Sequence, residues 1–315
     1  MNHLCRDEDA RSRGLRSVRR LGVLDEPSVN ACTRRMLFSF FLFGVSISFS
    51  GYFSFPFSFF DYCKSLARAT VMIYIILLRF RRFQMIRIEN LHKQYGYGDK
   101  KIDVLKGLDL TLEDEKLICV LGPSGSGKST FLNILGGIET IDKGRVEVLG
   151  KDLATMKKKE LEAYRRNHLG FVFQFYNLIG DLNVRENIEV GRFLSKNPLE
   201  IEKLIVDLGL TEHAYKFPNE ISGGQAQRTS IGRAVIKRPE LLICDEPTGA
   251  LDYESAKDVL VLIEKLNTLY HSTVIIATHN TQIAKMCDVI LTIHDGRIKT
   301  LENNAHKIPA EEVAW

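Results

Sequence analysis

Residues 116–130, Lys-Leu-Ile-Cys-Val-Leu-Gly-Pro-Ser-Gly-Ser-Gly-Lys-Ser-Thr, are the stretch that decides the fold. The apolar first part is typical of a buried strand, and the apolar run 131–135 that follows predicts a helix. Between strand and helix stands Gly-x-x-x-x-Gly-Lys-Ser, in the context that a phosphate-binding loop requires. The residues of this loop are Gly122, Pro123, Ser124, Gly125, Ser126, Gly127, Lys128, Ser129 and Thr130.

The residue types of the loop suit a chain of phosphates. Glycines let the backbone fold around an anion so that several N–H groups point inward. The helix that starts at Lys128 adds the positive end of its dipole. Lys128 supplies a positive charge to the outer phosphates, and the Ser129 hydroxyl can ligate Mg²⁺. The loop by itself leaves kinases, GTPases and ATPases open.

A second apolar run, 241–244, ends in the paired carboxylates Asp245 and Glu246. Asp245 is placed to hold Mg²⁺ through water, and Glu246 is placed to orient and polarise the attacking water of phosphoryl transfer. Together with Lys128, this pair predicts hydrolysis of a nucleoside triphosphate.

Four more strings stand in a definite order along the chain. Gln174 lies in Phe-Val-Phe-Gln-Phe, Asp252 ends Gly-Ala-Leu-Asp, and His279 lies in Thr-His-Asn. The string Glu-Ile-Ser-Gly-Gly-Gln, called the signature below, contributes Ser222, Gly223, Gly224 and Gln225. With these strings in this order, residues 85–300 resemble the ATP-binding-cassette (ABC) ATPases.

The resemblance implies a site that two chains share. Two such domains would pair head to tail around two ATP molecules. Lys128 of one copy and Ser222 to Gln225 of the other would hold the same γ-phosphate. Asp252 would communicate between the two sites, while His279 would contact the γ-phosphate and position Glu246.

Two further positions follow from the resemblance. Gln174 would reach Mg²⁺ and the attacking water, completing a metal set with Ser129 and Asp245. Tyr95 occupies the place of the aromatic residue that stacks on adenine, and Tyr97 in the same Tyr-Gly-Tyr-Gly turn is the competing candidate.

Several strings resemble one branch of the family, the ATPases of lipoprotein release and of macrolide or antimicrobial-peptide export. They include Gly170-Phe-Val-Phe-Gln-Phe-Tyr-Asn-Leu and Glu246-Pro-Thr-Gly-Ala-Leu-Asp. The resemblance implies a separate FtsX-like permease as partner and a peripheral place at the cytoplasmic face of the plasma (inner) membrane. The ATPase would drive export or mechanotransmission through that permease.

An alternative from another class is a non-transport ABC ATPase that acts on DNA or ribosomes. Residues 85–315 hold 30 Lys and Arg against 33 Asp and Glu, so overall charge gives a nucleic-acid partner no support. The segment between Lys128 and Ser222 also lacks the heptads of the DNA-repair relatives, and the chain carries one cassette where ribosome-acting relatives carry two.

The alternation of expected strands and helices predicts an α/β fold with a mostly parallel sheet. The resemblance implies the finer architecture of the P-loop NTPase class: a RecA-like sheet, an antiparallel β part and a helical signature subdomain. The ABC domain spans 85–300, its helical subdomain lies at about 175–239, and residues 301–315 form a polar C-terminal tail. Strands are expected near 86–90, 116–121, 169–173, 240–245, 273–277 and 287–293, and helices near 128–136, 254–269 and 280–286.

Residues 1–84 form a leader of different composition, with 12 of the 18 Phe and 12 Arg but a single Lys. One interpretation is that translation starts at Met85, which leaves the leader untranslated. A membrane anchor is another, because residues 36–60 carry no charge and roughly 20 apolar residues span a bilayer. A disordered segment is the third.

Overall fold

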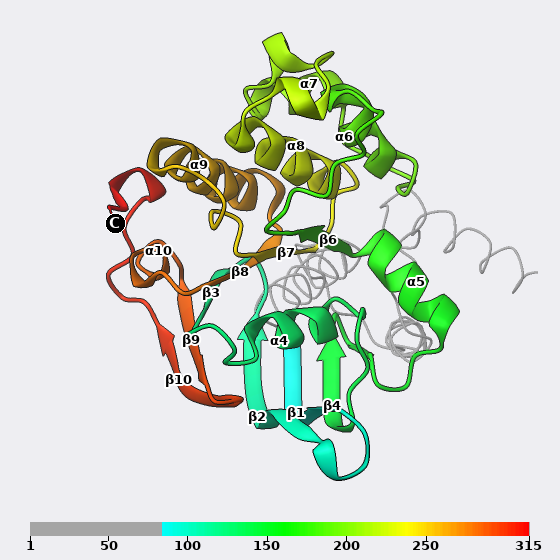
Figure 1. Cartoon of the computed structure of the whole chain (residues 1–315), viewed down its shortest axis with the longest axis vertical. Coiled ribbons are helices and arrows are strands. Elements are labelled where there is room, and N and C mark those ends of the chain that lie inside the picture. The colour runs from blue at the N-terminus through cyan, green and yellow to red at the C-terminus, as the bar shows by residue number, and fades with distance from the viewer. Residues whose placement is uncertain (1–83, 315) are drawn as a thin grey trace, which may run out of the picture. The chain divides into compact units, whose positions relative to one another are not determined.

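A computed structural model describes residues 84–314 of this chain (Figure 1). The three interpretations of the leader fall on residues 1–83, outside the described part. Within residues 84–314, no helix is both long enough and apolar enough to cross a bilayer.

A six-stranded sheet forms the centre of the domain, in the order β10-β9-β3-β8-β7-β6. Five of its strands are parallel, and only β10 runs antiparallel to its neighbour β9. This arrangement confirms the predicted mostly parallel sheet. The strands are β3 Leu117–Leu121, β6 Leu169–Val172, β7 Leu241–Asp245, β8 Thr273–Thr278, β9 Val289–His294 and β10 Arg297–Asn303.

Both faces of the sheet are covered at its central strands β3, β7 and β8, which explains why these three are apolar without alternation. In β3, Leu117 and Cys119 belong to one core, while Ile118 and Val120 belong to the other. Successive side chains of a strand point to opposite faces, so one short strand supplies both cores.

The second sheet has four antiparallel strands in the order β2-β1-β4-β5, which confirms the predicted antiparallel part. Helix α4 lies between the two sheets in Figure 1, and its Phe131 and Leu132 are buried in the core that both sheets share. The strands are β1 Gln84–Tyr95, β2 Ile102–Glu113, β4 Lys143–Val148 and β5 Lys151–Asp152.

Helices α6, α7 and α8 form the predicted helical subdomain, and α8 and α9 pack on the other core of the large sheet (Figure 1). The helices are α4 Lys128–Leu135, α5 Lys158–Asn167, α6 Val184–Arg192, α7 Ile201–Asp207, α8 Gly223–Val235, α9 Tyr253–Tyr270 and α10 Thr281–Ala284. Short 3₁₀ turns lie at Gly98–Lys100, Thr211–His213, Pro218–Glu220 and Ala310–Glu312.

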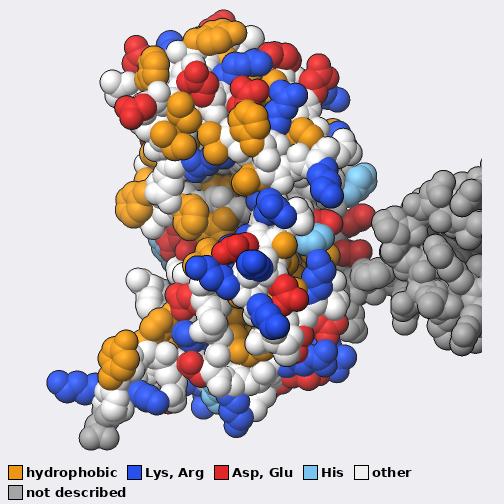
Figure 2. Space-filling view, turned by 90° about the vertical axis from the view of Figure 1, so that its right-hand side faces the viewer, with side chains coloured by type: hydrophobic (Ala, Val, Ile, Leu, Met, Phe, Trp, Pro, Cys, Tyr) orange, Lys and Arg blue, Asp and Glu red, His pale blue; other side chains and the backbone are white. Residues whose placement is uncertain are grey.

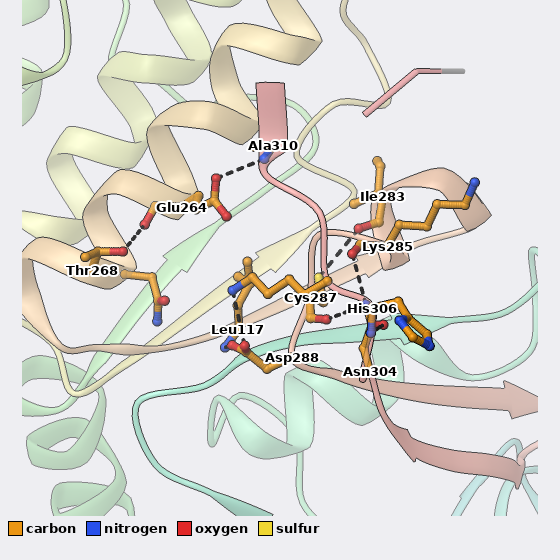
Figure 3. A network of polar contacts seen from close by, with 12 residues as sticks. Leu117, Glu264, Thr268, Ile283, Lys285, Cys287, Asp288, Asn304, His306 and Ala310 are labelled. Atoms are coloured by element: carbon orange, nitrogen blue, oxygen red, sulfur yellow. Dashed lines mark hydrogen bonds and ion pairs between the residues drawn. The ribbon is translucent and has the colours of Figure 1, made fainter. Parts of the chain in front are cut away.

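The end of the chain differs from the polar tail predicted at 301–315. Strand β10 continues to Asn303, and the segment after it folds back with Ala310 and Val313 buried. Asn304 Nδ2 donates to the carbonyl oxygens of Lys285 (2.9 Å) and Cys287 (3.0 Å), and Ala310 N donates to Glu264 Oε2 at 2.9 Å (Figure 3). The sequence gives little sign of this packing, because the few apolar residues of the C-terminal segment follow neither the period of a helix nor that of a strand.

Replacing Asn304 by Ala tests the anchoring of this segment. We expect N304A to lower the free energy of unfolding by about 1–3 kcal/mol, because two carbonyl oxygens lose their donor. Chemical denaturation monitored by circular dichroism measures the change. The exposed neighbour Asn303→Ala is the control, and equal stability of the two variants would contradict the anchoring role.

Candidate functional site

The phosphate-binding loop lies between the end of β3 at Leu121 and the start of α4 at Lys128. Two of its glycines have no room for a side chain. A Cβ at Gly122 would lie 2.2 Å from the Ile293 carbonyl oxygen, and one at Gly127 would lie 2.8 Å from Leu105 Cδ2. Gly127 also has φ 102°, a conformation that glycine adopts without steric cost. The loop shape therefore depends on these two glycines.

Lys128 turns its ammonium group back under the loop. Its Nζ donates to the carbonyl oxygens of Gly122 (2.8 Å) and Pro123 (3.0 Å), and the side chain is only 5% exposed. The same Nζ lies 3.9 Å from Glu246 Oε1. A buried cation thus stands between the loop and the second predicted carboxylate.

Asp245, at the end of β7, has a partly buried carboxylate that suits a hard cation such as Mg²⁺. Burial raises the pKa of its carboxyl, while a hydrogen bond with the Ser129 side chain and the charge of Lys128 act in the opposite direction. Among the described residues, its buried Oδ1 has no hydrogen-bond partner. Mg²⁺ is held by one or two carboxylates together with substrate phosphates. The pair of Asp245 and Ser129 fits such an ion, and no group of three or more acidic, His or Cys ligands occurs within residues 84–314.

Glu246 and His279 meet because they follow neighbouring parallel strands, β7 and β8. The Nδ1 atom of His279 lies 3.2 Å from a Glu246 carboxylate oxygen. Glu246 has a left-handed backbone (φ 46°), a conformation that is rare outside glycine and is concentrated at functional sites. Its backbone N–H donates to the Ala277 carbonyl oxygen at 3.0 Å, which fixes this turn to β8.

Gln174 reaches the same place from the segment that follows β6. A Cβ at Gly249 would lie 3.0 Å from Gln174 Nε2 and 3.3 Å from Glu246 Oε2. The amide and the carboxylate therefore both lie beside Gly249. The structure thus brings six of the predicted residues together at one edge of the sheet: Lys128, Ser129, Gln174, Asp245, Glu246 and His279.

Tyr95 ends β1 beside the loop, with its side chain 40% exposed. Its pKa is raised, first by burial and then by a hydrogen bond to Glu139, and a contact with the Thr130 hydroxyl opposes the rise. Tyr97 is almost fully exposed and precedes the turn Gly98–Lys100. The contact with Thr130 places Tyr95, of the two candidates, next to the loop.

The signature and Asp252 form a second group, at the starts of α8 and α9. Ser222 caps α8 by accepting from Gln225 N at 3.3 Å, and Asp252 caps α9 by accepting from Ser255 N at 3.0 Å. A Cβ at Gly224 would lie 2.9 Å from Ser255, so the two helix starts are in contact. Helix α8 and helix α4 pack on opposite faces of the large sheet, so the described fold does not bring the signature to Lys128 within one chain (Figure 1).

Sequence reasoning missed the residues that hold the segment after Gln174. Arg233 donates to the carbonyl oxygens of Asn177 (2.6 Å) and Tyr176 (3.0 Å), and burial lowers its pKa. Gln227 is fully buried, and its Nε2 lies 3.5 Å from the Phe173 carbonyl oxygen. Both side chains come from α8, the helix that begins with the signature. The only sequence signal for Arg233 and Gln227 is that they are polar residues in a helix whose other residues are mostly buried.

The loop, the acidic pair and the parallel sheet define a P-loop nucleotide-binding protein. A family model for ABC transporters matches residues 105–249. The bacitracin export ATP-binding protein BceA of Halalkalibacterium halodurans is 40% identical over 221 residues, which are 69% of this chain and 87% of that protein. The chain belongs to the ABC transporter family, and the described domain is an ATP-binding domain of that family.

Two other comparisons agree with this assignment. A putative ABC transporter ATP-binding protein of Mycoplasma pneumoniae is 42% identical over 234 residues, which are 73% of this chain and 50% of that protein. The chain therefore spans only half the length of that relative. The dimeric structure of MJ0796, a bacterial ABC transporter cassette, is similar with a TM-score of 0.64 and 33% identity, covering 70% of this chain and 98% of that one.

Replacing Lys128 by Ala tests the nucleotide site. We expect K128A to bind ATP roughly tenfold to a hundredfold more weakly, because a hydrogen bond to a charged group contributes about 1.5–3 kcal/mol. Equilibrium titration with a fluorescent ATP analogue measures the affinity. The exposed Lys143→Ala is the matched control. Equal ATP affinity of K128A and K143A would contradict the assignment of Lys128.

Proposed function

We propose that this domain hydrolyses ATP with Mg²⁺ and drives an ABC exporter, as one of two identical subunits that act on a separate FtsX-like permease. The observation that carries the proposal is the meeting of Lys128, Glu246 and His279 at the carboxyl ends of neighbouring parallel strands. In open α/β sheets, ligands bind in the crevice outside these ends.

The proposed chemistry assigns one task to each side chain at this edge. Lys128 binds the outer phosphates, and Glu246 orients and polarises the attacking water. His279 contacts the γ-phosphate and holds the Glu246 carboxylate, to which its Nδ1 lies 3.2 Å. Ser129, Asp245 and Gln174 would hold a Mg²⁺, which would supply positive charge beside the phosphates.

A second copy is part of the proposal because the signature lies on the other face of the sheet from α4. Ser222 caps a helix of 13 residues, and the N-terminal amides of such a helix bind anions. The signature can therefore contact only a γ-phosphate that is bound by another copy of the chain. Asp252, beside the signature, would then link the two sites. The structure of MJ0796 is dimeric, which supports the presence of a second copy.

The surface of the helical subdomain supports a membrane partner. Exposed apolar side chains gather on the upper part of the molecule in Figure 2, the part that holds α6 and α7 in Figure 1. Phe175, one residue after Gln174, is 71% exposed. We call the exposed apolar residues of the helical subdomain the subdomain patch; they are Phe175, Ile179, Phe193, Leu194, Val206, Tyr215 and Phe217. Exposed apolar patches mark protein–protein contact sites.

The activity of a relative supports export over the non-transport alternative. The protein from Halalkalibacterium halodurans is named for bacitracin export. An export role places the domain at the cytoplasmic face of the plasma (inner) membrane, held there by its permease.

Replacing Glu246 by Gln tests hydrolysis and dimerisation together. We expect E246Q to slow ATP hydrolysis about a hundredfold or more, because a general base contributes at least that factor. The intact ATP should trap a dimer, which light scattering after gel filtration detects. The exposed Glu302→Gln is the control. A monomeric E246Q at saturating ATP and Mg²⁺ would refute the two-copy site.

A pull-down from native cells in mild detergent tests the permease. We expect tagged wild-type protein to retain an FtsX-like membrane protein and Phe193→Glu to lose it, because a charge in an apolar contact is costly to desolvate. Ile102→Glu changes another exposed apolar residue outside the subdomain patch, 67% exposed against 82% for Phe193, and serves as the control. Retention by both variants would exclude the patch as the docking surface.

A further inference from the structure

The ring of Tyr95 is held by two charged side chains that the proposed chemistry does not use. Lys93 precedes it by two residues on β1. The Lys93 Nζ lies 5.3 Å from the centre of the Tyr95 ring, over its face. The Tyr95 hydroxyl donates to the Glu139 carboxylate.

Lys93 is itself fixed and buried. Its Nζ donates to the Thr140 carbonyl oxygen at 2.7 Å, and the side chain is 8% exposed. Burying an ammonium group is costly, and an apolar side chain would fill the same space without that cost. A cation over an aromatic face is favourable when it is desolvated. The ammonium group therefore adds an attraction to the Tyr95 ring that an apolar side chain would not provide.

Glu139 connects the ring to the helix of the phosphate-binding loop. Asn133 Nδ2, on α4, lies 3.4 Å from Glu139 Oε1, and Glu139 N donates to the Asn133 carbonyl oxygen at 3.2 Å. Helix α4 begins at Lys128. A chain of contacts thus runs from the Tyr95 hydroxyl through Glu139 and Asn133 to the helix that starts with the loop lysine.

We propose that Lys93 and Glu139 are positioning residues that set the Tyr95 ring for stacking on adenine at a fixed distance from the phosphate-binding loop. This proposal rests on the proposed function, in which the nucleotide is ATP and Tyr95 contacts its base. Lys93 covers one ring face and leaves the other to the base. Glu139 stops the side chain from rotating. A ring that is ordered before binding loses less conformational entropy when the base arrives.

The ratio of affinities for ADP and pyrophosphate isolates this effect, because both ligands carry the diphosphate and only ADP has a base. Each is measured on the full chain with Mg²⁺ by displacement of a ribose-labelled fluorescent ADP. We expect E139A, Y95F and K93M each to weaken ADP binding about two- to tenfold and to leave pyrophosphate binding unchanged. The range corresponds to the ordering of one side chain.

A double-mutant cycle tests whether Glu139 acts through the Tyr95 hydroxyl. The variant Y95F/E139A should bind ADP no more weakly than either single variant, because both changes remove the same contact. E139Q keeps an acceptor oxygen and should retain most of the ADP affinity. Asp142→Asn is the matched control, since Asp142 accepts from Gln94 N at 2.6 Å and adds charge near the ring without bonding to it.

The outcomes separate this inference from the proposed function. Y95A should lower the ADP-to-pyrophosphate ratio roughly tenfold, as expected for loss of base stacking. If Y95A leaves the ratio unchanged, the base site assigned to Tyr95 is wrong. If Y95A lowers the ratio but E139A and K93M do not, only the positioning role fails. The positioning role would also be refuted if E139A or K93M lost equal affinity for ADP and for pyrophosphate. A loss of ADP affinity in D142N as large as that in E139A would refute it as well.

Discussion

The parallel pairing of β3, β8 and β7 is the constraint on which the site depends. Leu121 pairs with Thr278, and Asp245 pairs with Ala277, so the three strands end at the same level. Asp245 is the last residue of β7, and the phosphate-binding loop, Glu246 and His279 follow directly after the ends of β3, β7 and β8. Because the carboxyl ends of parallel strands share an edge, groups more than 100 residues apart in sequence meet without long loops. Each strand is buried on both faces, which keeps this register fixed.

The same strand geometry brings charged side chains together at this edge of the sheet. The sheet delivers a buried ammonium group and two carboxylates to one small volume, where unpaired charges are costly. Lys128 is satisfied by two loop carbonyl oxygens and lies near Glu246, while Asp245 keeps one buried oxygen without a partner among the described residues. A nucleotide phosphate chain with its cation offers the complementary charges. The fold therefore favours binding of the nucleotide and its cation, because they pair charges that the protein alone leaves without a partner.

Helix α8 connects the two halves of the proposed machinery. Its first turn is the signature, and its Arg233 holds the segment that carries Gln174 through the carbonyl oxygens of Tyr176 and Asn177. The subdomain patch begins in that same segment, at Phe175. A displacement of α8 would therefore act on the signature and, through Arg233, on the segment that carries Gln174 and Phe175. This linkage is a property of tertiary contacts between α8 and a loop that precedes it by about 50 residues in the chain.

The sequence by itself determined the P-loop fold class, the two carboxylates after β7 and the membership of Gln174, Asp252 and His279 in one ordered set. The first two features are local, because a loop between a strand and a helix or a strand that ends in acids is recognisable within about ten residues. The ordered set was recognised by its resemblance to a family. Only the tertiary structure decided which side chains touch: the Glu139 contact with Tyr95, the Arg233 anchor and the packing of Asn304 to Val313. Such contacts join residues without a shared period, and their partners are set by how the two sheets and the helices stack. The same stacking placed the signature away from Lys128, on the opposite face of the sheet.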